Sequence, residues 1–194
     1  MKKIKLMSLL SLALLAGCAN GYGLIKENRA SVRSDVFQEV ADPAAVPGSY
    51  ADLRINGVLK THSAERSASV DSHGTSDYRL LLNIDGQALT LAGGMRQENK
   101  ESERLYDPEA GEGTRYRFTK VLRLKPGVHR LVVGLPDDQV AVAKDLHLKA
   151  EVNTLELEPV YGQKIGAGRP RNDRARSFTE GIRSFRVILN GKEV

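Results

Sequence analysis

The sequence predicts an all-β fold, a single antiparallel β-sandwich of about seven to nine strands. Three observations lead to this prediction. Apolar and polar residues alternate with a period of two from Ala51 onward. Turn dipeptides separate the alternating runs, and no convincing helical pattern appears among them. The core must consist mostly of Leu, Val and Ile, because the chain has no Trp and only four Phe.

The clearest strand signal is the run that begins at Tyr78. Tyr78, Leu80, Leu82 and Ile84 share one face, and Asp85-Gly86 then predicts a hairpin into residues 88–91, because its tight turn needs positive φ. Residues 115–124 alternate in the same way, which predicts a strand with one buried face. The other expected strands cover residues 53–55, 129–135, 140–142, 146–150, 153–159 and 184–189, and the expected polar loops cover 62–76, 96–114 and 162–177.

Pro126-Gly127 predicts a type II turn, from which residues 129–135 return as a strand. Proline presets φ at the second turn position, and glycine accepts positive φ at the third. The last strand is followed by Asn190-Gly191, a second tight-turn dipeptide.

The N-terminus has the layout of a secretory signal, with three lysines before an apolar run over residues 6–16. This run is too short to span a bilayer as a helix, which takes about 20 residues. No later segment approaches that length, so we expect no transmembrane helix.

Leu15-Ala16-Gly17-Cys18 at the end of the apolar run resembles the lipobox of bacterial lipoproteins. The resemblance implies cleavage before Cys18, a diacylglyceryl thioether on this cysteine and acylation of its new amino group. Several acyl chains would give the stable anchoring that one chain cannot give. The absence of aspartate at Ala19-Asn20 favours the outer membrane, with the domain facing the periplasm. The alternative is a secreted soluble protein with an incidental cysteine near the cleavage site.

Three regions follow from these signals: a signal peptide at 1–17, a lipidated N-terminus and flexible tether at 18–48, and a β-sandwich domain at 49–194. Within the tether, apolar spacing allows a short amphipathic helix around 28–40, but the sequence favours a plain spacer. Loss of the three signal lysines lowers the formal charge from +5 to +2. A charge this small does not favour nucleic acid as a partner.

Residues 124–133, Leu-Lys-Pro-Gly-Val-His-Arg-Leu-Val-Val, resemble the core of PEGA-type domains, and Ile84-Asp85-Gly86 matches an upstream element of that family. The likeness covers residues 78–161. It implies an immunoglobulin-like sandwich module of bacterial envelope proteins, with a binding or structural role and no catalytic residues. The sequence departs from the family because it lacks the Pro-Glu-Gly-Ala tetrapeptide and carries a polar insert between Gly94 and Arg115.

Candidate metal ligands gather in the polar loop that begins at His62. The others are Glu65, Asp71, His73 and Asp77. These side chains could hold a metal only if the loop folds back on itself. Because their spacing matches no known type of metal site, the sequence favours a solvated loop with neither metal nor cofactor. The two remaining histidines, His129 and His147, are expected on strands.

Signals for catalysis are weak. The chain lacks a Gly-x-Ser-x-Gly elbow. The carboxylate pairs Asp137-Asp138 and Asp107/Glu109 fall in turns or loops, where we interpret them as surface charge. The sequence therefore predicts no catalytic residues.

A basic segment near the C-terminus is a candidate contact for an anionic ligand. Its residues are Lys164, Arg169, Arg171, Arg174 and Arg176. They could contact a lipid headgroup, a polysaccharide phosphate or an acidic partner. The alternative is a solvated loop.

The function expected from these features is that of a membrane-anchored envelope lipoprotein with a non-catalytic binding or structural domain. One alternative is an enzyme acting on envelope polymer, with a site built from the three polar loops. Another is a carbohydrate-binding module, which needs an exposed aromatic platform. The side chains that could supply one are Tyr106, Tyr116, Phe118, Tyr161 and Phe178.

Overall fold

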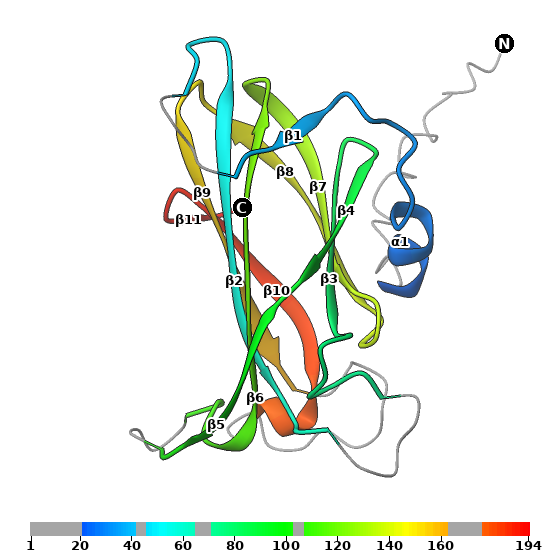
Figure 1. Ribbon diagram of the computed structural model, residues 1–194, viewed down its shortest axis with the longest axis vertical. Coiled ribbons are helices and arrows are strands. Elements are labelled where there is room, and N and C mark those ends of the chain that lie inside the picture. Colours follow the sequence, from blue (N-terminus) through cyan, green and yellow to red (C-terminus); the bar gives the residue numbers. More distant parts are fainter. Residues whose placement is uncertain (1–20, 42–45, 65–70, 103–106, 163–175) are drawn as a thin grey trace, which may run out of the picture.

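The structure, a computed structural model, describes residues 21–41, 46–64, 71–102, 107–162 and 176–194. Two β-sheets face each other and enclose an apolar core (Figure 1). This confirms the predicted all-β sandwich. The described residues form eleven strands, more than predicted, because several short edge strands have no alternation signal. Of the helices in the same ranges, none combines the length and the apolar character that a membrane span requires.

The larger sheet has seven strands in the order β1-β6-β2-β9-β10-β11, with β5 also paired to β6. Its pairings are antiparallel except that of β2 with β9, which is parallel. β1 pairs with the end of β6 and β5 with its beginning, so both lie along one edge of β6. The strands are β1 (Phe37–Glu39), β2 (Ala51–Thr61), β5 (Gly94–Lys100), β6 (Gly111–Leu124), β9 (Val152–Tyr161), β10 (Ile182–Leu189) and β11 (Lys192–Glu193).

The smaller sheet has four antiparallel strands in the order β4-β3-β7-β8. The predicted hairpin at Asp85-Gly86 is present, and both residues have positive φ (48° and 91°). The strands are β3 (Arg79–Ile84), β4 (Gln87–Ala92), β7 (Gly127–Leu135) and β8 (Val140–Leu148).

The Pro126-Gly127 turn joins the two sheets and does not close a hairpin. β6 lies in the larger sheet, whereas β7 pairs with β3 and β8 in the smaller one. The prediction that 129–135 return alongside the preceding strand was therefore wrong. The His129 ring fixes this corner, because its two nitrogens contact the Asp85 carboxylate (2.7 Å) and the Lys125 carbonyl (2.8 Å).

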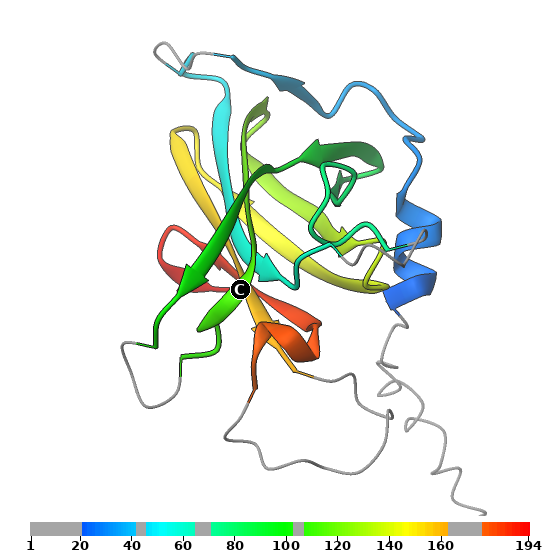
Figure 2. The same ribbon diagram turned by 60° about the horizontal axis from the view of Figure 1, so that its bottom comes forward.

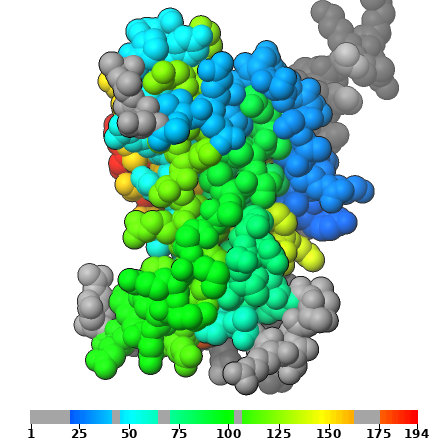
Figure 3. Space-filling model, viewed as in Figure 1, coloured from blue at the N-terminus to red at the C-terminus, as the bar shows by residue number. Residues whose placement is uncertain are grey.

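The N-terminal segment, expected to be a tether, packs on the outer face of the smaller sheet. Its helix α1 (Gly21–Asn28) contacts β7 and β8, whereas its strand β1 joins the edge of the larger sheet. The helix that the sequence allowed around 28–40 is not formed there. Ile25 of α1 is buried, and the carbonyl of Asn28 accepts a hydrogen bond from Asn83 Nδ2 (2.9 Å). Figure 3 shows this segment, in blue, lying directly on the body of the domain. Its cover explains why Leu81 and Val132 are buried on the side of the sheet that faces away from the core.

Two glycines of α1 give a matched pair of variants. A Cβ at Gly21 would lie less than 3.0 Å from the carbonyl oxygen of Gln139, whereas a Cβ at Gly23 would meet nothing within 4 Å. We expect Gly21→Ala to lower the free energy of unfolding by about 1–3 kcal/mol, because the helix start must move away from the β7–β8 turn. Gly23→Ala should raise it by about 0.5–1 kcal/mol through helix propensity. Urea denaturation measures both, and equal effects would contradict the observed docking of α1.

The region 96–114, predicted to be a polar loop, contains two paired strands. β5 pairs with the first seven residues of β6. The prediction was wrong because the residues of β5 are mostly exposed on both faces, so their sequence carries no alternation.

One ion pair in the larger sheet has a buried carboxylate and a partly exposed arginine. The side chain of Asp52 on β2 is fully buried and accepts two hydrogen bonds from Arg123 on β6 (2.7 and 2.8 Å). The hydrogen bonds from Arg123 lower the pKa of Asp52 below its ordinary value of 3.8, against the opposing effect of burial.

This pair predicts an acid dependence of stability. Because the pKa of Asp52 is lower in the folded than in the unfolded state, its contribution is complete above the unfolded value of 3.8 and is lost as the pH falls through the folded value. We expect the unfolding free energy of the unmodified chain to fall more steeply below pH 4 than that of Asp52→Asn. Parallel slopes in urea titrations at several acidic pH values would count against this.

Candidate functional site

Three chain segments bring titratable side chains together at the end of the sandwich where the short 3-10 helix η1 (Phe178–Glu180) lies (Figure 2). His62 directly follows β2. Asp71 and His73 come from the loop before β3, and Asp138 comes from the β7–β8 turn. We call His62, Asp71, His73 and Asp138 the His–Asp cluster. The loop therefore does fold back on itself, which is the condition under which the sequence allowed a metal site.

Local turns hold the loop residues in place. The Asp71 carboxylate accepts a hydrogen bond from the backbone N–H of His73 (3.0 Å), a typical Asx turn. The next residue, Gly74, has a φ of 74° that favours glycine. In the β7–β8 turn, the N–H of Gln139 donates to the carbonyl of Pro136 (3.1 Å), which places Asp138 beside the loop.

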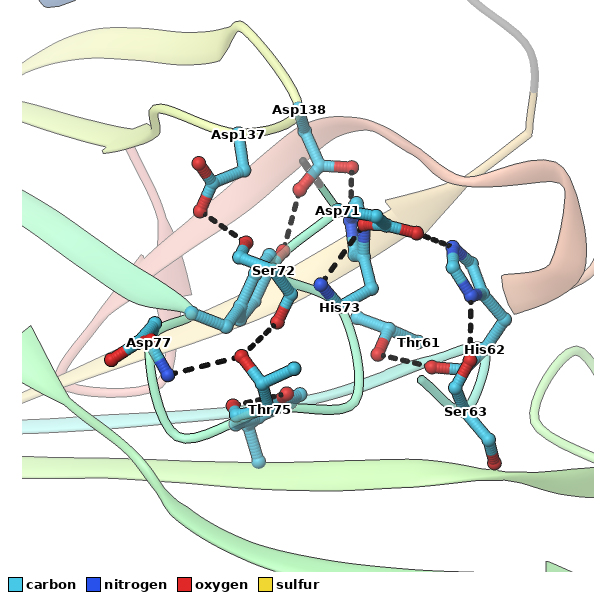
Figure 4. Close-up of polar contacts among 12 residues, drawn as sticks. Thr61, His62, Ser63, Asp71, Ser72, His73, Thr75, Asp77, Asp137 and Asp138 are labelled. Atoms are coloured by element: carbon cyan, nitrogen blue, oxygen red, sulfur yellow. Dashed lines mark hydrogen bonds and ion pairs between the residues drawn. The ribbon is translucent and has the colours of Figure 1, made fainter. Parts of the chain in front are cut away.

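The carboxylate of Asp71 lies between the two imidazole rings (Figure 4). Its Oδ1 is 2.5 Å from Nδ1 of His73, and its Oδ2 is 3.3 Å from Nε2 of His62. The other nitrogen of His73, Nε2, lies 3.3 Å from Oδ1 of Asp138. The other nitrogen of His62, Nδ1, lies 3.0 Å from the carbonyl oxygen of Ser63. Each ring is thus fixed on both sides.

The electrostatics of the cluster favour a charged His73. Burial alone would lower its pKa, but the hydrogen bonds and charges of Asp138 and Asp71 outweigh burial and raise the pKa to about 9. Burial and the neighbouring Asp138 raise the pKa of Tyr78, so its hydroxyl stays protonated and donates to Asp138 (2.6 Å). The raised pKa favours the protonated form of His73, whose ring lies between Asp71 and Asp138.

A row of rings connects the cluster to the core. Successive ring centroids lie 4.7 Å apart from His62 to His73, 5.0 Å from His73 to Tyr78 and 4.8 Å from Tyr78 to Tyr116. Tyr116 stacks in turn on Phe118 at 6.1 Å. Because Tyr78, Tyr116 and Phe118 are fully buried, the row anchors the histidine rings to the most rigid part of the molecule.

The cluster forms one wall of a pocket of about 250 Å³. The floor and the other walls come from the end of β2, from η1 and from the start of β10. The lining residues are Lys60, Thr61, His62, His73, Asp138, Phe178, Thr179, Glu180, Gly181 and Ile182. The pocket therefore offers two histidine rings and two carboxylates, Asp138 and Glu180, beside apolar surface.

Lys60, one of the lining residues, links the elements that form the pocket. Its side chain is buried, and Nζ donates to the carbonyls of Glu109 (2.9 Å) and Gly111 (2.6 Å) and lies 4.7 Å from the centre of the Phe178 ring. Burial lowers its pKa. With its ammonium group directed at these partners, Lys60 holds β2, β6 and η1 together.

Of the carboxylates that the sequence analysis interpreted as surface charge, Asp137 is exposed as expected, whereas Asp138, Asp107 and Glu109 are largely buried. Only 9% of each of the Asp138 and Asp107 side chains is exposed. Asp107 pairs with Lys100 (2.8 Å), and Glu109 accepts hydrogen bonds from Arg115 and Tyr161 (both 2.8 Å). The sequence analysis also missed Tyr78 and Asp138 as parts of the site. The only available signal was that Asp138 lies in the short turn between two predicted strands.

The aromatic platform required of a carbohydrate-binding module is not formed by its candidates within the described ranges. Tyr116, Phe118, Tyr161 and Phe178 are all buried. Tyr106 lies outside the described residues.

Other predicted site residues lie mostly outside the described ranges. These are Cys18, Lys164, Arg169, Arg171 and Arg174, together with Glu65 of the histidine loop. Arg176 is described and is half-buried. Asp77 is placed outside the cluster, where it pairs with Arg79 (3.8 Å). His129 and His147 lie on strands β7 and β8, as predicted.

Comparison with known proteins yields no relative. No family model, no curated protein and no solved structure matches this chain.

Proposed function

We propose that this chain is an envelope lipoprotein, anchored through lipid on Cys18, whose β-sandwich is a non-catalytic binding domain with its site held beside the membrane. The lipobox resemblance supports the anchor. The observation that carries the position of the site is the contact between Gly21 and the backbone at Gln139, one residue from Asp138. Cys18 precedes Gly21 by three residues, which span at most about 11 Å.

The short connection matters because α1 is packed on the domain. A long flexible tether would let the domain take any orientation toward the membrane. Because Gly21 approaches the β7–β8 turn, an anchor three residues earlier would keep this turn, and with it the His–Asp cluster, near the membrane. The proposed destination is the outer membrane, with the domain facing the periplasm.

A non-catalytic binding role agrees with the hydrogen bonds that the hydroxyl groups near the cluster form. Ser72 Oγ donates to Asp137 (2.6 Å), Thr75 Oγ1 to the carbonyl of Ser72 (2.7 Å) and Thr61 Oγ1 to the carbonyl of His62 (3.0 Å). A serine or threonine nucleophile needs a neighbouring base in hydrogen-bond contact. In the described part of the site, none of these three hydroxyls forms a hydrogen bond with a histidine ring.

The proposed ligand is another envelope component, either a protein or an anionic lipid or polysaccharide. The basic residues Lys164, Arg169, Arg171, Arg174 and Arg176 directly precede η1 in the sequence, and η1 lines the pocket. We include them in the proposal as the contact for anionic groups at the membrane surface.

Mass spectrometry of the mature chain tests the anchor. The proposal predicts an N-terminus at Cys18 that carries a diacylglyceryl group, and transfer of Cys18→Ser from the membrane fraction to the soluble fraction. Cys18→Ala serves as a second replacement, and Ser8→Ala within the signal is the matched control that should stay membrane-bound. An unmodified Cys18 in the mature chain would refute the anchor.

The enzyme alternative has one observation in its favour, which is the convergence of partly buried titratable groups beside a pocket. Incubation of the purified chain with isolated envelope polymer tests it. Products that form with the unmodified chain and disappear with Asp71→Asn would favour the enzyme over the binding domain.

A further inference from the structure

We propose that His62, Asp71 and His73 bind a divalent transition metal ion, with Zn²⁺ as the preferred ion. The inference names a ligand for the site in the proposed function, although metal binding itself does not depend on the lipid anchor. Two imidazoles and one carboxylate form a donor set suited to zinc and its neighbours in the first transition row.

The geometry of the three donors carries the proposal. One ligand atom from each residue can be chosen so that all three lie within 4.8 Å of one another. Nε2 of His62 and Oδ2 of Asp71 are 3.3 Å apart. Ligand atoms in a tetrahedral zinc site with bonds of about 2.0–2.1 Å are separated by roughly the same 3.3 Å. Nδ1 of His73 lies 2.5 Å from the other carboxylate oxygen, Oδ1, as in a hydrogen bond. Replacement of the shared hydrogen by a metal ion therefore requires these two atoms to move about 0.8 Å apart.

The second observation is the set of partners on the far side of each ring. A histidine that binds a metal usually donates its other N–H to a carboxylate or a backbone carbonyl, which fixes the tautomer and the ring orientation. The structure has both kinds of partner. Nε2 of His73 faces Asp138 (3.3 Å), and Nδ1 of His62 faces the carbonyl of Ser63 (3.0 Å).

Asp138, the outer partner of His73, is itself held in place, because it accepts a hydrogen bond from the buried Tyr78 hydroxyl (2.6 Å). The remaining nitrogens, Nε2 of His62 and Nδ1 of His73, both face the carboxylate of Asp71. One nitrogen of each ring thus faces an outer partner and the other faces the Asp71 carboxylate, which is the arrangement expected of two metal-binding histidines.

The pocket gives such an ion access to ligands from outside. His62 and His73 both line it, and the His62 side chain is 41% exposed. Three protein ligands leave one position of a tetrahedral ion for water or for an oxygen donor. A bound carboxylate or phosphate from an envelope component would fit this position.

Calorimetric titration with Zn²⁺ alone tests the site. The unmodified chain is purified in detergent, stripped with a chelator and then titrated. We expect one ion per chain. His62→Ala and Asp71→Asn should each weaken binding at least 100-fold, and Asp138→Asn should weaken it about 10–100-fold through the lost outer partner. His147→Ala is the matched control, because this exposed strand histidine lies outside the cluster and should bind as the unmodified chain does.

His62→Ala is the most informative variant because the exposure of the ring makes misfolding least expected there, and circular dichroism checks the fold of each variant. Stoichiometric binding that is lost in His62→Ala and kept in His147→Ala supports the proposal. Absence of stoichiometric binding, or equal binding by both variants, overturns it. Failure of the metal titration leaves the lipid anchor untouched, and failure of the mass-spectrometric test leaves the metal site untouched.

Discussion

Arg123→Ala is expected to lower the free energy of unfolding by about 3 kcal/mol. The variant removes both hydrogen bonds to the Asp52 carboxylate, whose side chain is fully buried while Arg123 is in place. The expected loss lies at the lower end of the range for broken buried pairs, because the Arg123 side chain is 20% exposed and water can partly replace it. Urea denaturation near pH 7 measures the effect.

Two controls separate the buried charge from a general loss of side-chain packing. Arg186→Ala removes an arginine with two carboxylate partners, Glu158 and Glu193, but all three side chains are about half exposed, so the loss should stay below about 1 kcal/mol. The double variant Asp52→Asn, Arg123→Met removes both charges and should recover much of the stability lost in Arg123→Ala. A loss in Arg123→Ala no larger than in Arg186→Ala would contradict this account.

Tyr116→Ala is expected to lower the free energy of unfolding by about 3–5 kcal/mol, the range for aromatic residues removed from a core. The ring is fully buried between Tyr78 and Phe118, so its removal leaves a cavity in the row of rings beneath the His–Asp cluster. Thermal or urea denaturation measures the loss.

The matched variant is Tyr116→Phe, which keeps the ring and removes the hydroxyl that donates to the carbonyl of Thr75 (2.8 Å). We expect a smaller loss of about 1–3 kcal/mol from the unsatisfied carbonyl. Because Thr75 belongs to the loop of Asp71 and His73, hydrogen exchange of residues 71–76 should become faster in this variant. Equal destabilisation by the two variants would mean that the ring itself contributes little.

The sequence predicted the sandwich because one face of most strands is buried. The alternation at Tyr78, Leu80, Leu82 and Ile84 corresponds to side chains in the core, and Asp85-Gly86 forms the expected hairpin. β5 escaped prediction because its residues are exposed on both faces. The sheet-to-sheet corner at Pro126-Gly127 also escaped, since the same dipeptide favours a hairpin and a corner alike.

The sequence does contain a sign that the smaller sheet is covered on its outer face, but a search for alternating apolar residues does not detect it. Residues 80–82 and 131–133 are continuous apolar runs, a pattern typical of strands buried on both faces. The cover is supplied by α1, whose eight residues include only one that is buried. A helix with so narrow an apolar face is hard to distinguish from a spacer by its sequence.

For the candidate site, the sequence supplied the residue types but not their convergence. His62, Asp71 and His73 were recognised as candidate ligands within one loop. Asp138 and Tyr78 were not, because they approach the loop from a distant turn and from the start of β3. Only tertiary structure brings residues separated by 65 positions into contact.

The central claim is that the pocket lies beside the membrane to which the chain is anchored. Under the proposed lipidation of Cys18, the sole cysteine of the chain, Thr179→Cys and Ala150→Cys would each carry one reactive thiol. Thr179 lines the pocket, whereas Ala150 follows β8 at the opposite end of the domain, about 27 Å along the strand. A fluorophore at either position can be quenched by nitroxide groups on lipid headgroups of reconstituted vesicles. The account predicts stronger quenching at position 179 than at position 150. Equal quenching, or stronger quenching at position 150, would contradict it.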